Sequence, residues 1–187
     1  MKNTIAIFCL ISLSFFSCNK DSKLIADKDF IEISLDGETY KTEWEKGSLL
    51  FNAGDQLGCG SMPYMITTLS DIVTSKLEFC TDIKYYQNNE DFKDSKPGNY
   101  QITNGVDYPS SCNLCLEVCF IDKSQENDFT RIQPGGIHTV TKIQEYESSN
   151  TEVYYVIHGE FTCSFLNSVN EIISLTGKYQ ITISTLL

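Results

Sequence analysis

The sequence predicts an all-β protein, and three observations lead to this prediction. Short runs of alternating apolar and polar residues recur along the chain, as in strands with one buried face. β-Branched and aromatic residues are frequent in these runs, whereas Gly, Pro, Asn and Asp lie between them. No window shows a sustained 3.6-residue period with helix caps. We therefore expect about nine to eleven antiparallel strands in a single β-sandwich, with a lipocalin-like β-barrel as the alternative.

The first two predicted strands, residues 30–35 and 38–44, flank Asp36-Gly37. Asp-Gly between alternating runs is a strong signal for a tight hairpin, because both positions of the turn need positive φ. The polar segment 87–98 is predicted to be a loop. The other predicted strands are 49–51, 62–69, 76–83, 100–102, 114–121, 136–143, 153–165 and 172–184. Gly159 and Gly177 interrupt the last two, where a bulge or a close approach is expected.

The N-terminus has the layout of a secretory signal: Lys2, an apolar run over 4–16, then Ser17-Cys18. The apolar run is shorter than the roughly 20 residues that a membrane-spanning helix needs. Phe15-Phe16-Ser17-Cys18 resembles the lipobox of bacterial lipoproteins, in the relaxed form common in Bacteroidota. This resemblance implies removal of residues 1–17, acylation of Cys18, a tether over 18–29 and a folded domain over 30–187.

Several short motifs in the domain resemble those of a family of Bacteroidota lipoproteins. They are Asp36-Gly37, Gly98-Asn99-Tyr100, Gly136-Ile137-His138-Thr139-Val140, Gly159-Glu160-Phe161 and Gly177-Lys178-Tyr179. The family implies a β-sandwich on a lipid anchor and offers no active site. Asn rather than Asp follows Cys18, so the lipoprotein resemblance implies the outer membrane, facing either the periplasm or the cell surface. The membrane is expected to be a partner through the lipid on Cys18.

The net charge of −11 excludes one class of partner. A polyanion repels phosphate backbones, so we expect no nucleic-acid partner. No cofactor is predicted, because the sequence contains no phosphate-binding glycine loop, no His-Glu-x-x-His and no EF-hand loop.

Four cysteines are disulfide candidates: Cys80, Cys112, Cys115 and Cys119. Export permits disulfides. Within strand 114–121, Cys115 and Cys119 lie about 13 Å apart on the face opposite the apolar residues, too far for a mutual bond. Strand parity places Cys80 on the corresponding face of its own strand. A bridge from Cys80 to this group is the preferred pairing, and Cys112 could bond Cys115 locally. Cys163 is predicted to be a buried apolar residue.

His138, His158 and Glu160 form a weak candidate metal site. If the hairpin turns near Ser148-Ser149, His138 lies beside His158 or Glu160 on the solvent face. Two imidazoles and a carboxylate suit zinc or nickel. Such groups are more often incidental cross-strand neighbours, so no metal is predicted. Tyr85-Tyr86 is a weak candidate for a sugar-stacking platform.

These features favour a membrane-anchored binding or interaction module of the cell envelope, for a glycan, a peptide or a partner protein. No catalytic residue is predicted. A hydrolytic or metal-assisted enzyme is an alternative that requires a deep pocket where His138, His158 and Glu160 converge. A carrier of a small apolar ligand is a second alternative, and it requires a closed barrel with a dry cavity.

Overall fold

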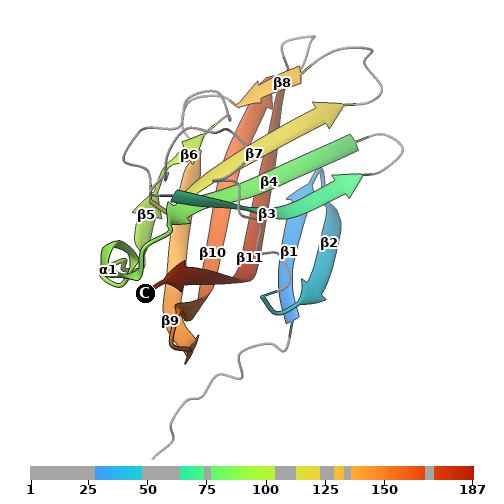
Figure 1. Cartoon of the computed structure of the whole chain (residues 1–187). Coiled ribbons are helices and arrows are strands. Elements are labelled where there is room, and N and C mark those ends of the chain that lie inside the picture. The colour runs from blue at the N-terminus through green and yellow to red at the C-terminus, as the bar shows by residue number, and fades with distance from the viewer. Residues whose placement is uncertain are drawn as a thin grey trace, which may run out of the picture.

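The computed structural model is almost entirely β-structure, as the sequence predicts (Figure 1). It describes residues 28–47, 64–73, 77–103, 113–122, 129–132, 136–166 and 171–187. The described elements are β1 (Lys28–Leu35), β2 (Glu38–Glu45), β3 (Tyr64–Val73), β4 (Leu77–Tyr86), α1 (Asn89–Phe92), β5 (Gly98–Tyr100), β6 (Ile102–Thr103), β7 (Cys115–Asp122), β8 (Phe129–Ile132), β9 (Ile137–Ser148), β10 (Glu152–Leu166) and β11 (Ile172–Leu186). The sequence did not predict β8 or α1.

The described strands form two layers joined through the long strand β10. Sheet A has the antiparallel order β2-β1-β11-β10-β9-β5. Sheet B has the order β8-β7-β4-β3, and β6 is added to β7 in parallel. β8 connects the layers because it also pairs with the end of β10. In Figure 1, β3, β4 and β7 cross the strands of sheet A at a steep angle.

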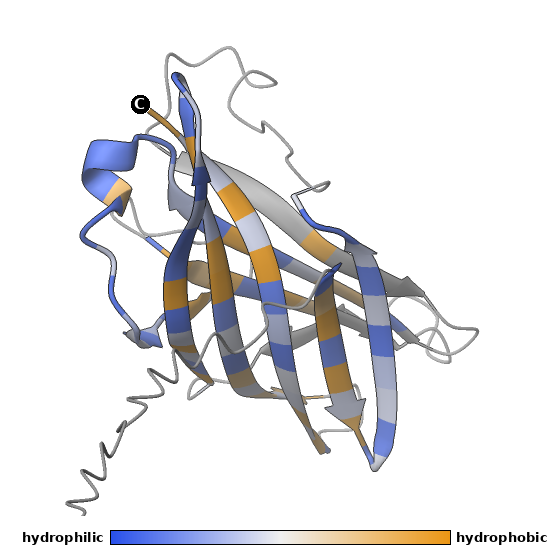
Figure 2. Cartoon of the chain, turned by 90° about the horizontal axis from the view of Figure 1, so that it is seen from below, coloured by the Kyte–Doolittle hydropathy of each residue, from blue (hydrophilic) through white to orange (hydrophobic). Residues whose placement is uncertain are grey.

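The strand order contradicts the lipocalin-like barrel that was the alternative fold. Among the described residues, the path of hydrogen-bonded strands ends at β2 on one side and at β3 on the other, so it does not close. Large apolar side chains fill the space between the layers, and Tyr85, Tyr179, Phe79, Phe92 and Phe165 are the largest that are fully buried. Hydrophobic and hydrophilic residues alternate along the strands of sheet A (Figure 2). The sandwich prediction is confirmed.

Two local predictions about glycine are also confirmed. Asp36 and Gly37 have φ of 49° and 81°, as a tight hairpin turn requires. On β10 and β11, Gly159 lies opposite Tyr179, and Phe161 lies opposite Gly177. Each aromatic ring covers the glycine facing it, so closely that a Cβ on either glycine would overlap the ring. The two glycines therefore make room for the two rings.

The folded domain begins earlier than predicted, because Lys28 and Asp29 belong to β1 rather than to a tether. Asp29 is 1% exposed. Its carboxylate accepts hydrogen bonds from the backbone N–H of Gly47 (3.0 Å) and of Thr182 (2.9 Å), and from the Thr182 hydroxyl (3.0 Å). Burial raises the pKa of Asp29 in spite of these donors. The three bonds tie the start of β1 to β11 and to the turn after β2.

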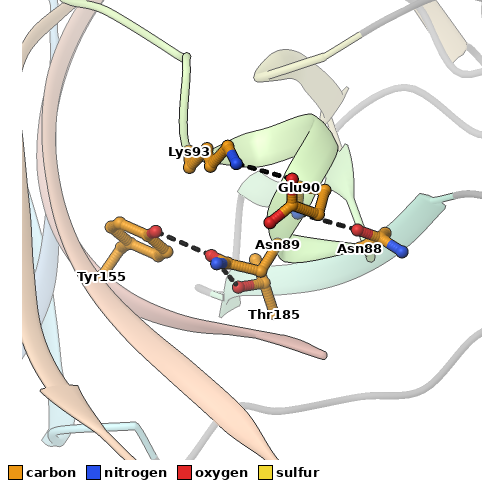
Figure 3. Close-up of polar contacts among 6 residues, drawn as sticks. All are labelled: Asn88, Asn89, Glu90, Lys93, Tyr155 and Thr185. Carbon is orange, nitrogen blue, oxygen red and sulfur yellow. Dashed lines mark hydrogen bonds and ion pairs between the residues drawn. The ribbon is translucent and has the colours of Figure 1, made fainter. Parts of the chain in front are cut away.

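The segment predicted as a polar loop contains the one-turn helix α1. Asn88 caps it by accepting from the Glu90 N–H at 2.7 Å. The Asn89 side-chain oxygen accepts from the hydroxyls of Tyr155 (2.7 Å) and Thr185 (3.0 Å), as Figure 3 shows. Phe92 is fully buried, with its ring centroid 4.8 Å from that of Tyr155. One apolar residue in a polar segment thus docks α1 against β10.

Candidate functional site

The outer face of sheet A carries a groove with a volume of about 450 Å³. Four adjacent strands line it, and their register aligns the lining side chains in two rows. One row is Glu32, Lys178, Glu160 and Thr139; the other is Ser34, Thr176, Thr162 and Ile137. Gly177 and Phe161 complete the lining. These rows alternate along each strand with core residues such as Ile33 and Tyr179, which explains why they face outward.

The first row of the groove carries charge. The Lys178 Nζ lies 2.8 Å from the Glu32 Oε1. The lysine side chain is 58% exposed, so this ion pair contributes little to stability. Glu160 is exposed on the other side of Lys178. The row therefore presents two carboxylates and one ammonium group.

The second row of the groove is mainly hydroxyl groups, and the polar surface continues on both sides. The Ser34 Oγ lies 3.2 Å from the Thr39 Oγ1 on β2. Thr139 donates to the Asn99 side-chain oxygen on β5 at 3.0 Å. None of the ten lining residues is His or Cys. The groove thus offers hydrogen bonds and charge rather than an activated nucleophile.

The structure does not assemble the predicted metal candidate, and the assumed register was wrong. Ser148 pairs with Val153, so the turn lies later than predicted, and two bulges then shift the ladder between β9 and β10. As a result His138 lies opposite Phe161 and is fully buried, whereas Glu160 is exposed on the opposite face. His158 pairs with Lys142. In the part of the chain that the structure describes, no three His, Cys, Asp or Glu side chains are grouped to hold a metal. The convergence that the enzyme alternative requires is not formed.

His138 has a structural environment in the core. Its Nε2 lies 2.7 Å from the hydroxyl oxygen of Tyr179. The two residues belong to β9 and β11, and they meet across Gly159 of β10, which has no side chain to separate them. Burial lowers the pKa of His138 to about 4 and raises the pKa of Tyr179. Both groups are therefore neutral at neutral pH, and the hydrogen bond connects β9 to β11 across the intervening β10.

The predicted sugar-stacking platform is also wrong. Tyr85 is fully buried, and its ring meets that of Phe92 edge-on at a centroid distance of 6.2 Å. Tyr86 is half-buried and packs against the core. Phe79, Ile83 and Tyr85 share one face of β4, so strand parity alone could have placed Tyr85 in the core.

The faces of the strands on which Cys80, Cys119 and Cys163 lie agree with the alternation of residues along each strand. Cys80 lies directly opposite Cys119, one member of the predicted group, but both carry thiols, so the predicted bridge from Cys80 is not present in this structure. A hydrogen bond to Cys80, together with burial, raises the pKa of Cys119. Cys115 is disulfide-bonded. Cys112 and Cys18 lie outside the described residues. Cys163 is buried as predicted, and burial raises its pKa to about 12.

The groove could not be predicted from the sequence, because its members are ordinary strand residues. The alternating runs in the sequence do indicate that Ser34, Thr162 and Thr176 each face outward. Only the register between four strands shows that these positions form one surface.

The described helix, α1, is too short to span a membrane. Comparisons of the chain with family models, with curated proteins and with solved structures give no match.

Proposed function

We propose that the protein is a lipid-anchored binding module of the cell envelope, and that the groove on sheet A is its ligand site. The alignment of two polar rows over four strands supports this proposal. The groove volume of about 450 Å³ is within the range typical of small-molecule sites. Its hydroxyl and carboxylate groups provide donors and acceptors on one continuous surface.

A neutral glycan is the ligand class that fits these groups best. Sugar hydroxyls both donate and accept, which matches the serine and threonine hydroxyls and the two carboxylates. Peptide and protein partners usually insert large apolar or aromatic anchors. Ile137, at 59% exposure, is the one large apolar side chain that the groove lining exposes. The net charge of −11 disfavours anionic glycans.

The proposed anchor is an acylated Cys18 in the outer membrane of a Bacteroidota-like cell, with the domain facing the periplasm or the cell surface. Residues 19–27 separate Cys18 from β1 and, fully extended, span about 30 Å. Two or more acyl chains hold a protein stably on a bilayer. The domain would therefore stay close to the membrane.

Binding of a panel of neutral oligosaccharides, followed by titration calorimetry of the positive ones, tests the ligand site. A Glu160→Gln/Thr162→Ala variant is expected to lose at least about tenfold in affinity, because a hydrogen bond to a charged group contributes about 1.5–3 kcal/mol. Glu147→Gln, an exposed position on β9 outside the groove, is the matched control and should bind like the wild type. Equal affinity of the groove variant and the wild type, or a panel without any binder, would contradict the proposal.

A further inference from the structure

A pair of thiols on sheet B has no part in the proposed binding function. Cys80 of β4 and Cys119 of β7 are directly paired in register, and both are half-buried. Opposite Cα atoms in antiparallel strands are about 4.5–5.5 Å apart. Disulfides join Cα atoms that are about 4.4–6.8 Å apart. The two sulfur atoms can therefore bond without a shift of the backbone.

The surroundings of the pair give the two thiols different roles. Asp82 and Glu117 form the next cross-strand pair, two residues along each strand and so on the same face. The Cys119 Sγ donates to the Glu117 Oε1 at 3.5 Å, and Cys119 also has Cys80 as a hydrogen-bond partner. The Glu117 carboxylate thus holds the proton of Cys119. The geometry therefore favours Cys80 as the thiol that reacts first as a thiolate.

We propose that Cys80 and Cys119 are a redox-active dithiol that exchanges with small disulfides, with Cys80 as the attacking and Cys119 as the resolving thiol. The Cys80 thiolate attacks one sulfur of a disulfide RSSR, which forms a mixed disulfide and expels RS⁻. Cys119 then loses its proton, attacks the Cys80 sulfur and expels the second RS⁻. The protein thiols give two electrons to RSSR, which becomes two RSH, and the Cys80–Cys119 bond forms.

The adjacent carboxylates define which small disulfide reacts. Asp82 and Glu117 repel an anionic disulfide and attract a cationic one, and the net charge of −11 acts in the same direction. Cystamine, which is cationic, should react at least about tenfold faster at low salt than oxidised glutathione, which is anionic. The ratio should fall at high salt, because salt screens the long-range interaction between an approaching charged disulfide and the negative charge of the protein.

Peptide mass spectrometry of the full-length protein after incubation with cystamine tests the proposal. The wild type should yield a linked Cys80–Cys119 peptide without bound cysteamine. Cys119→Ser should retain cysteamine on Cys80, whereas Cys80→Ser should leave Cys119 unmodified over the same time. Cys163→Ser, which removes a buried thiol elsewhere, is the matched control and should behave like the wild type.

Two results would overturn the inference. Equal adduct yields in Cys80→Ser and Cys119→Ser would refute the assignment of the two roles. A folded wild type that keeps both thiols, while the urea-unfolded chain is oxidised by the same reagent, would refute the dithiol itself.

Discussion

Acidification should destabilise the fold through His138, a buried imidazole that is neutral in the native state. Its surroundings include the Tyr179 hydroxyl at 2.7 Å and the Tyr100 ring, whose centroid is 6.2 Å away. Burial lowers the pKa of His138 to about 4, whereas an unfolded histidine titrates near about 6.5. Between these values the unfolded chain binds a proton that the folded chain excludes. Stability should therefore fall as the pH decreases from about 6.5 to about 4.

The expected magnitude follows from this difference of about 2.5 pKa units. Each unit corresponds to about 1.36 kcal/mol, so His138 should account for about 3 kcal/mol of lost stability at pH 4. Urea unfolding, followed by the fluorescence of Trp44, would measure the free energy of unfolding at several pH values between 7 and 4. The variant His138→Gln keeps a polar group near Tyr179 but has no titrating ring.

The difference between wild type and His138→Gln isolates this histidine, because the carboxyl groups titrate in both proteins. The free energy of unfolding of the wild type, relative to that of His138→Gln, should fall by about 3 kcal/mol as the pH decreases from 7 to 4. His158→Gln, which removes the other histidine, serves as the control and should leave the pH dependence contributed by His138 unchanged. Parallel curves for wild type and His138→Gln over the whole range would refute the reasoning.

Four further outcomes are expected. Asp29→Ala should lower the free energy of unfolding, measured in urea, by about 3 kcal/mol, because three donors lose their buried acceptor. Asp29→Asn keeps one side-chain oxygen as an acceptor and should cost less than half as much. Gly177→Ala should cost about 2 kcal/mol in the same assay, and a smaller residue at Phe161 should recover part of the loss. Phe92→Ala should cost about 4 kcal/mol, and an unchanged midpoint would show that α1 does not contribute to the core. Cys18→Ala should move the protein from the membrane to the soluble fraction, and unchanged partitioning would contradict the lipid anchor.

Features that depend on one strand or one turn were predictable from the sequence. Asp36-Gly37 specifies its hairpin through positive φ at both residues. Parity within a strand correctly placed Cys163 in the core and Cys80 on the face of its strand away from Phe79 and Ile83. The glycines at 159 and 177 were correctly linked to a close approach, although the sequence does not show which ring approaches.

Features that depend on the register between strands were not predictable. Each one-residue shift of the β9–β10 ladder moves the His138 side chain to the other face of the sheet relative to Glu160. This ladder contains two bulges. The groove requires four strands in the correct register, so its members could not be grouped from the sequence. The burial of Phe92 depends on docking of a short polar segment, which no periodic pattern indicates.

The pairing of β1 with β11 has a consequence for how the chain matures. β1, the first described strand, joins the rest of sheet A by pairing with β11, the last one. Asp29 and Thr182, which are hydrogen-bonded, are separated by almost the whole sequence of the domain. Contacts between such distant segments form late in folding, because a long loop must close first. During synthesis, which begins at the N-terminus, β1 can therefore pair with β2 but lacks its second neighbour until β11 has appeared. Over this interval the β1 edge of the β1–β2 hairpin is unpaired and can pair with the strand edges of other chains.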